Sequence, residues 1–190
     1  MKKISFLAIF FFLAVLCAHG QMGKKKPAIT VTYEPGYVNI IEIGPGLGLL
    51  DVEADYSRYV FSLTSVNGYL INKTFLAGIG AGFNIYNGGI MVPLFVDLRY
   101  TLKNGVYEPF ILMDQGLLLS VNDIVNNTAL FINPGVGIRK VLSGRMAFYA
   151  NMGLMVQMSP GIGRSSFLTV RAGLMLSRKY ILRSPRMPVL

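Results

Sequence analysis

The chain has 190 residues, of which 53% are hydrophobic and only 14% are charged, and its formal net charge is +9. This composition is apolar for a soluble domain, although the length is enough for one domain with its own core. After the N-terminus, no apolar run approaches the ~18 residues that a membrane helix needs. The apolar residues are distributed by alternation instead, which is typical of a membrane β-barrel.

The first 20 residues have the three parts of a secretory signal peptide. Lys2 and Lys3 precede an apolar stretch at 4–16, and Ala18-His19-Gly20 offers a small-residue cleavage site before Gln21. One alternative is a membrane anchor, for which the apolar run is short. The other is a lipoprotein modified at Cys17, but the bulky Leu16 just before it fits that processing poorly. Cleavage would remove the single cysteine and the single histidine, so the mature chain would contain no disulfide, thiol nucleophile or imidazole.

The next residues, 21–37, are polar, contain two prolines and predict an N-terminal linker. A barrel is predicted over 38–180, and 181–190 is predicted to be a C-terminal tail. Within the barrel region, turn residues separate strand-length segments. We expect eight strands, at 38–50, 57–71, 74–86, 90–102, 106–120, 128–141, 146–158 and 167–180.

The third segment, "TFLAGIGAGFNIY", shows the alternation best, because every second residue from Phe75 to Ile85 is apolar and those between are mostly small or polar. This period of two predicts a strand with two different faces. The second segment, "SRYVFSLTSVNGYLI", alternates least well. We expect a β-bulge near Asn67-Gly68 to shift its register.

The connections alternate in length along the chain. The turns after the second, fourth and sixth segments are short ("NK", "KNG", "SGR"), whereas those after the first, fifth and seventh are longer. Short turns at one end and long loops at the other are typical of an up-and-down outer-membrane barrel. The "NGG" at 87–89 makes one connection on the long-loop side a tight turn.

The charged residues of the segments indicate which face points inward. They fall on the faces rich in glycine, asparagine, serine and threonine, whereas a soluble lipocalin-like barrel would place many lysines and glutamates on an outer polar face. Small residues with charges of both signs suit the narrow interior of an eight-stranded barrel, where buried charges must pair. We therefore expect the apolar faces to contact lipid and the interior to hold a polar network of Glu42, Asp97, Arg99, Glu108, Asp114, Arg139 and Arg171.

Tyrosines gather near the ends of the segments, where an interfacial belt would place them. Tyr69 and Tyr149 depart from this pattern, and the preference of tyrosine for strands is the alternative explanation. The belt is expected to contain Tyr56, Tyr59, Tyr86, Tyr100, Tyr107 and Tyr180.

The stretches "LAGIGAGFNIY", "VPLFVDLRYTL", "EPFILMDQG" and "NPGVGIRKVLS" resemble the small outer-membrane β-barrel proteins of Bacteroidota, of the PorT-like or OmpX- and OmpW-like kind. The resemblance covers about residues 38–180 and implies a location in the cell outer membrane and insertion by the barrel assembly machinery. It implies no catalytic residue, because this family has heterogeneous functions. Many such barrels end in an aromatic residue, whereas this chain continues with "ILRSPRMPVL" and ends at Leu190.

The sequence predicts no catalytic, metal or cofactor site. Known small-barrel enzymes depend on a histidine base, the glycine repeats precede no helix that would make a phosphate loop, and no cluster has metal-ligand character. We expect a structural or binding barrel, filled by side chains, whose outer loops contact a protein or a small ligand. The alternatives are a narrow pore or transporter for small or hydrophobic solutes and an enzyme without histidine. An exported chain is not expected to bind nucleic acid.

Overall fold

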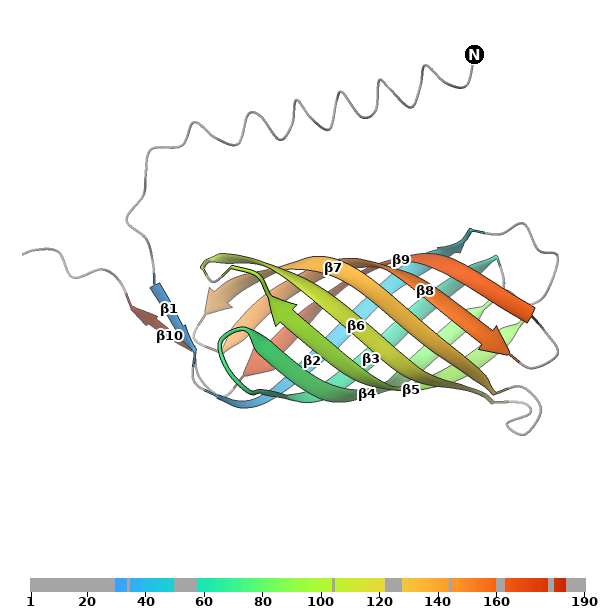
Figure 1. The fold of residues 1–190 in the computed structure, drawn as a ribbon, viewed down its shortest axis with the longest axis horizontal. Coiled ribbons are helices and arrows are strands. Elements are labelled where there is room, and N and C mark those ends of the chain that lie inside the picture. The colour runs from blue at the N-terminus through green and yellow to red at the C-terminus, as the bar shows by residue number, and fades with distance from the viewer. Residues whose placement is uncertain are drawn as a thin grey trace, which may run out of the picture. The chain divides into compact units, whose positions relative to one another are not determined.

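The computed structural model describes residues 30–33, 35–49, 58–103, 105–121, 128–143, 145–159, 163–177 and 180–183. Eight strands, β2 to β9, form a closed antiparallel barrel in which neighbours in sequence pair and β9 closes onto β2 (Figure 1). The predicted eight-stranded antiparallel barrel is therefore confirmed. Within these ranges, no helix is long and apolar enough to cross a membrane.

The eight strands have 12 to 15 residues each. Short turns around 71–74, 102–106 and 144–145 connect them at one end of the barrel, which we call the turn end. The other connections, including the tight turn with Gly89 at a positive φ of 151°, lie at the opposite or loop end. The strands are β2 (Gly36–Gly48), β3 (Tyr59–Leu70), β4 (Phe75–Tyr86), β5 (Gly89–Thr101), β6 (Tyr107–Ser120), β7 (Ala129–Ser143), β8 (Met146–Ser159) and β9 (Gly163–Ser177).

The register of the eight pairs fixes the stagger of the barrel. A row of paired residues that starts at Gly36 returns to β2 at Gly46, ten residues further along, after passing through Leu70, Leu76, Arg99, Leu112, Gly135, Gly153 and Thr169. With ordinary strand spacings, this stagger corresponds to strands tilted by about 40° from the barrel axis. The interior of such a barrel is narrow enough for side chains to fill.

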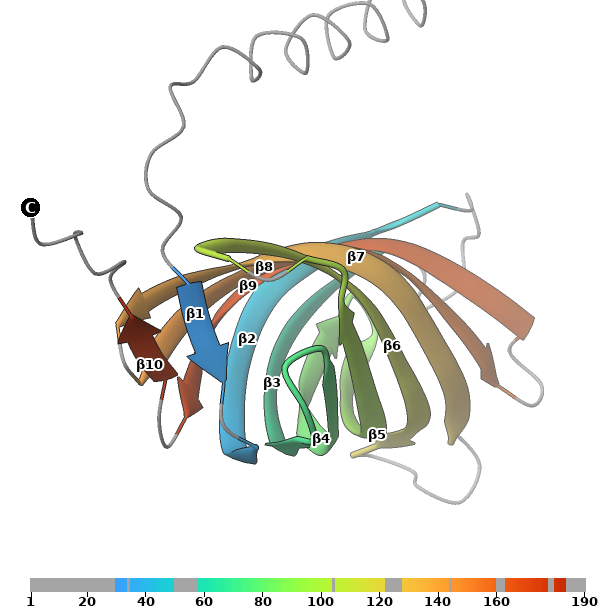
Figure 2. The ribbon, with the colours of Figure 1, turned by 60° about the vertical axis from the view of Figure 1, so that its left-hand side comes forward.

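Two short strands outside the barrel correct the predicted boundaries. β1 (Thr30–Tyr33) and β10 (Tyr180–Arg183) pair antiparallel with each other (Figure 2). β1 falls in the predicted linker, and β10 begins at Tyr180, the last residue of the predicted barrel, and continues into the predicted tail. Local alternation did not reveal them because each has only four residues. The predicted signal peptide lies outside the described residues.

The pairing also corrects two expectations about the strands. β3 pairs with β4 without interruption through Asn67 and Gly68, and the register shift lies instead between Val141 and Ser143 on β7. The alternation of β3 is weak because Ser65 and Asn67 stand on its outward face. The predicted loop before the eighth segment is shorter than expected, since β9 begins at Gly163 and pairs from there with β8.

The two faces of the barrel wall have opposite chemistry. Large apolar side chains are exposed on the outward face of every strand, for example Ile79 at 69% and Val136 at 53%. The charged side chains of Glu42, Asp97 and Arg99 are at most 3% exposed. The apolar face therefore points outward, as the alternation in the sequence predicts.

Some outward positions are polar, and those of β2 and β3 bond to one another. The Asn39 amide donates to Ser65 Oγ at 3.2 Å and to Asn67 Oδ1 at 3.1 Å, and the Tyr37 hydroxyl donates to Asn67 Oδ1 at 2.6 Å. These bonds satisfy polar groups that would otherwise weaken the apolar surface.

Candidate functional site: the charged barrel interior

The interior contains three layers along the strands. The middle layer is charged, and apolar side chains occupy the layers on either side of it. Toward the turn end these are Val38, Ile40, Leu70, Leu76, Phe110, Ala147 and Met175, and toward the loop end they are Val60, Met91, Leu118, Ala129, Phe131, Met155 and Phe167. The charged groups of the middle layer are thus enclosed between two apolar layers.

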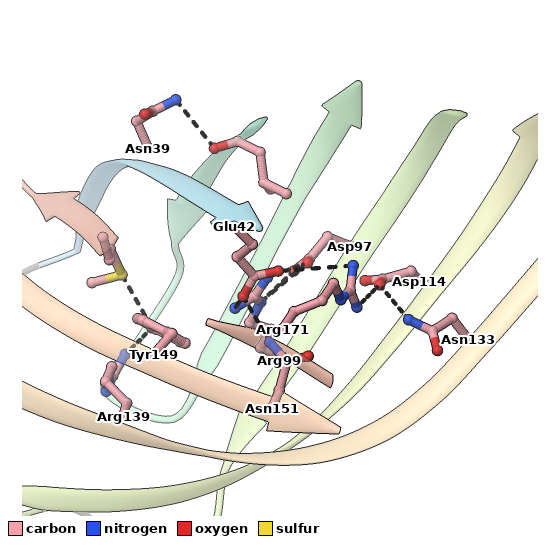
Figure 3. Close-up of polar contacts among 12 residues, drawn as sticks. Asn39, Glu42, Asp97, Arg99, Asp114, Asn133, Arg139, Tyr149, Asn151 and Arg171 are labelled. Atoms are coloured by element: carbon pink, nitrogen blue, oxygen red, sulfur yellow. Dashed lines mark hydrogen bonds and ion pairs between the residues drawn. The ribbon is translucent and has the colours of Figure 1, made fainter. Parts of the chain in front are cut away.

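Arg99 on β5 connects two carboxylates of the middle layer (Figure 3). Its Nε and Nη2 atoms donate to the Asp97 carboxylate at 2.7–3.0 Å, and its Nη1 donates to Glu42 Oε1 at 2.9 Å. The guanidinium carbon also lies 5.0 Å from the centre of the Tyr149 ring. Charge-assisted bonds of this bidentate kind are the strong ones in proteins, so Arg99 is held rigidly.

Arg171 on β9 makes a second bridge in the same layer. Its Nη2 donates to Asp114 Oδ2 at 2.6 Å, and its Nη1 lies 3.8 Å from Glu42 Oε2. Asn133 donates to Asp114 at 3.0 Å, and Asn151 donates to Glu42 at 2.8 Å. Glu42 therefore contacts both arginines and an amide, which makes it the centre of the cluster.

A separate ion pair lies closer to the turn end. Arg139 binds Glu108, its direct partner across the β6–β7 pair, through Nε and Nη2. Its Nη1 donates to the Tyr149 hydroxyl at 3.1 Å, and that hydroxyl donates to Met175 Sδ at 3.1 Å. Tyr149 thus joins this pair to Arg99, because its ring lies beside both guanidinium groups.

The structure therefore brings all seven predicted interior residues into one connected region. It adds Asn133, Tyr149, Asn151 and Thr169, which were not in the predicted network. Each of these lies on the inward face of its strand, at alternate positions from a charged residue of the same strand or opposite one in the neighbouring strand. This alternation is the sequence signal by which they could have been found. The middle layer holds three carboxylates and two guanidinium groups, so its charges balance only in part.

A small cavity of about 20 Å³ lies beside this cluster toward the loop end. Four polar atoms of its lining have no hydrogen-bond partner among the described residues: Thr64 Oγ1, Asn84 Oδ1, Asp114 Oδ1 and Arg171 Nε. The volume suits one water molecule, and the lining offers two acceptors, one N–H donor and one hydroxyl that can donate.

The charged side chains of the described interior bind one another. Asp97 and Asp114 bind arginines, and no nucleophile–base pair accompanies them in the described interior. The described residues also contain no group of three acids, cysteines or histidines that could hold a metal ion. The arrangement can hold strands together and block the lumen.

Four of the predicted belt tyrosines can be placed. Tyr59, Tyr100 and Tyr107 are exposed on the outward face, as a belt requires. The prediction for Tyr86 is wrong, because this side chain points into the barrel. Its hydroxyl donates to Gln157 Oε1 at 3.0 Å, and its ring packs edge-on against Phe167. Tyr37 and Tyr69 are exposed near the turn end instead. Tyr56 and the side chain of Tyr180 lie outside the described part.

No family model and no curated protein matches the chain. Among solved structures, the barrel is similar to the crystal structure of Neisserial surface protein A, with 9% sequence identity and a TM-score of 0.57 over 76% of this chain and 99% of that chain. This likeness shows a shared fold: the chain is a small, closed, eight-stranded antiparallel barrel.

Two further solved structures match with lower TM-scores. A de novo designed transmembrane β-barrel is 12% identical, with a TM-score of 0.44 over 77% of this chain and 98% of that chain. The N-terminal β-barrel domain of Pseudomonas aeruginosa OprF is 12% identical, with a TM-score of 0.43 over 75% of this chain and 97% of that chain. The resemblance to PorT-like proteins of Bacteroidota stays a prediction.

Proposed function

We propose that this protein is an integral outer-membrane β-barrel with a closed interior, which acts as a structural or binding protein through its loop end. One observation carries the proposal: the wall is apolar outside and charged inside. In water, burying paired charges while exposing a ring of leucine, isoleucine and valine would oppose the hydrophobic effect. In a bilayer the same arrangement is favourable, because lipid covers the apolar face and every backbone group pairs around the closed sheet.

The likeness in fold to a Neisserial surface protein supports a location in the cell envelope. The predicted signal peptide supports export, and insertion would then depend on the barrel assembly machinery. The two longer connections at the loop end, around 49–58 and 121–128, and the shorter one around 160–162 would face outward and contact a protein or small ligand. Asp97 and Asp114 bind arginines in the described interior, and we propose a structural or binding role for the barrel.

A pore or transporter is the alternative function. The bridges of Arg99 and Arg171 cross the lumen in the middle layer, and apolar layers lie on either side of them. A conducting path is lined by groups that bind and release ions, whereas these charges bind one another. The observations therefore favour a closed barrel.

Single-channel recording in a planar bilayer tests the choice. Insertion is first established by the heat-dependent gel mobility of the folded barrel and by its protection from protease in vesicles. We expect the inserted protein to give no unitary current steps. Arg99→Met removes the side chain that bridges Asp97 and Glu42 across the lumen, so it is the variant to record beside the unaltered protein. Reproducible steps from the unaltered protein would instead establish a pore. Failure of the folded protein to enter vesicles would overturn the membrane assignment itself.

A further inference from the structure

A shallow, wide-open groove of about 570 Å³ crosses the outward face of the barrel over β6 to β9. It begins near the turn end at Leu102 and Pro109 and continues past Ile138 to Met152 and Val170 at mid-strand. Ala150 is one reason for the hollow, since its methyl group is the smallest outward side chain in this part of β8. The outward side chains along the groove are apolar, so its occupant must be a hydrocarbon chain or an apolar protein surface.

A cationic group lies at the turn-end margin of this groove. Lys140 and Tyr107 pair directly across β6 and β7, two residues below the Pro109–Ile138 pair and on the same face. The Lys140 ammonium lies 5.4 Å from the centre of the Tyr107 ring, which holds it at the surface. Lys103 and Arg145 are exposed in the turns on either side.

No exposed carboxylate neutralises these cations within the part of the chain that the structure describes. The carboxylates of that part are Glu42, Asp97, Glu108 and Asp114, and each is at most 1% exposed inside the barrel. The third short turn adds another exposed cation, Lys73. The turn end therefore has a positive rim beside a tyrosine belt, at the level where the head groups of a bilayer leaflet would lie.

We infer that this groove binds an anionic phospholipid, with one acyl chain along the Ala150 hollow and the phosphate on Lys140, between Lys103 and Arg145. The inference rests on the proposed membrane location and adds a lipid site to it. Charge complementarity selects this occupant over two others. A second copy of the chain related by a two-fold axis would bring Lys140 toward another cation, and a zwitterionic lipid carries no net charge for the rim to attract.

Native mass spectrometry of the folded protein, released from detergent micelles containing phosphatidylglycerol or phosphatidylcholine, tests the inference. We expect phosphatidylglycerol to stay bound preferentially. Lys140→Gln should reduce the bound fraction about fivefold, the loss expected for one cation at a lipid surface. Ala150→Leu should fill the hollow and reduce binding as well. The matched controls Lys73→Gln and Ala77→Leu change a turn cation and an outward alanine away from the groove, and both should bind as the unaltered protein does.

Equal retention of the two lipids would overturn the inference, as would unchanged binding in Lys140→Gln. A loss as large in Lys73→Gln would overturn the specific site and leave only a general effect of the positive rim. Dimeric ions that disappear in Ala150→Leu would assign the groove to a second copy. The protease-protection test in vesicles separates these results from the membrane assignment, since a barrel can insert fully without preferring any lipid.

Discussion

Asp97 and Asp114 lie directly opposite each other on β5 and β6, and both carboxylates are buried in the barrel. Two like charges in this position repel each other. Each is bound by a different arginine, Asp97 by Arg99 and Asp114 by Arg171, and Glu42 contacts both of these cations. The interior charges therefore depend on one another as a group.

Arg99→Met should strongly destabilise the barrel, because it leaves Asp97 and Glu42 without their main cation in a buried site. Removal of one partner of a buried ion pair costs about 3–5 kcal/mol. Urea unfolding in lipid vesicles, followed by far-ultraviolet circular dichroism, measures the free energy of unfolding. Arg58→Met, which changes an exposed arginine at the loop end, should stay within about 0.5 kcal/mol of the unaltered protein. Equal midpoints for the two variants would contradict the assigned role of Arg99.

Asp97→Asn combined with Arg99→Met should be less destabilising than the sum of the two single changes. The double change removes one carboxylate together with the cation that binds it, so less charge stays unpaired. Residues in one network typically show coupling of about 0.5–3 kcal/mol. A double-mutant cycle in urea measures this term, and the cycle of Asp97→Asn with Arg58→Met should be additive. Additivity in both cycles would mean that the pair does not act as a unit.

Leu63→Arg should destabilise the barrel in vesicles far more than Tyr69→Arg does. Both positions are exposed on the outward face of β3, but Leu63 lies near the middle of the strand and Tyr69 near the turn end. An outward arginine costs about 2–4 kcal/mol at the bilayer midplane and about 0–1 kcal/mol near the interface. Unfolding in urea at fixed lipid composition gives the comparison. Similar small losses at the two positions would argue that water, rather than lipid, covers this face.

Gly44→Ala should impair folding, because β2 and β9 approach closely at this position. A Cβ atom there would press on the carbonyl oxygen of Val170 and on Arg171 Cα, which are backbone atoms that cannot move aside cheaply. Overpacking of this kind typically costs about 1–3 kcal/mol. The fraction that reaches the heat-modifiable folded form after refolding measures the effect. Gly105→Ala in a turn, where the nearest atom is 3.9 Å from the added carbon, should refold like the unaltered protein.

Alternation in the sequence was enough to predict the number of barrel strands, their antiparallel order and the face that carries the charges. This information is local, since successive side chains of a strand point to opposite faces. The inward positions of Glu42, Asp97 and Arg171 followed from the parity of each strand alone. The same reasoning failed for β3, because the outward Ser65 and Asn67 interrupt its apolar face and imitate a shift in register.

Only the tertiary structure decided which charges meet, how the barrel closes and where its surface is hollow. Arg99 reaches Glu42 over 57 residues of sequence, and Asn151 reaches it over 109. The ten-residue stagger around the barrel sets these contacts, because it determines which positions of separate strands share one height. The β1–β10 pair and the groove beside Lys140 likewise depend on which strands lie side by side. Alternation assigns a side chain to a face, and the closed sheet selects its neighbours there.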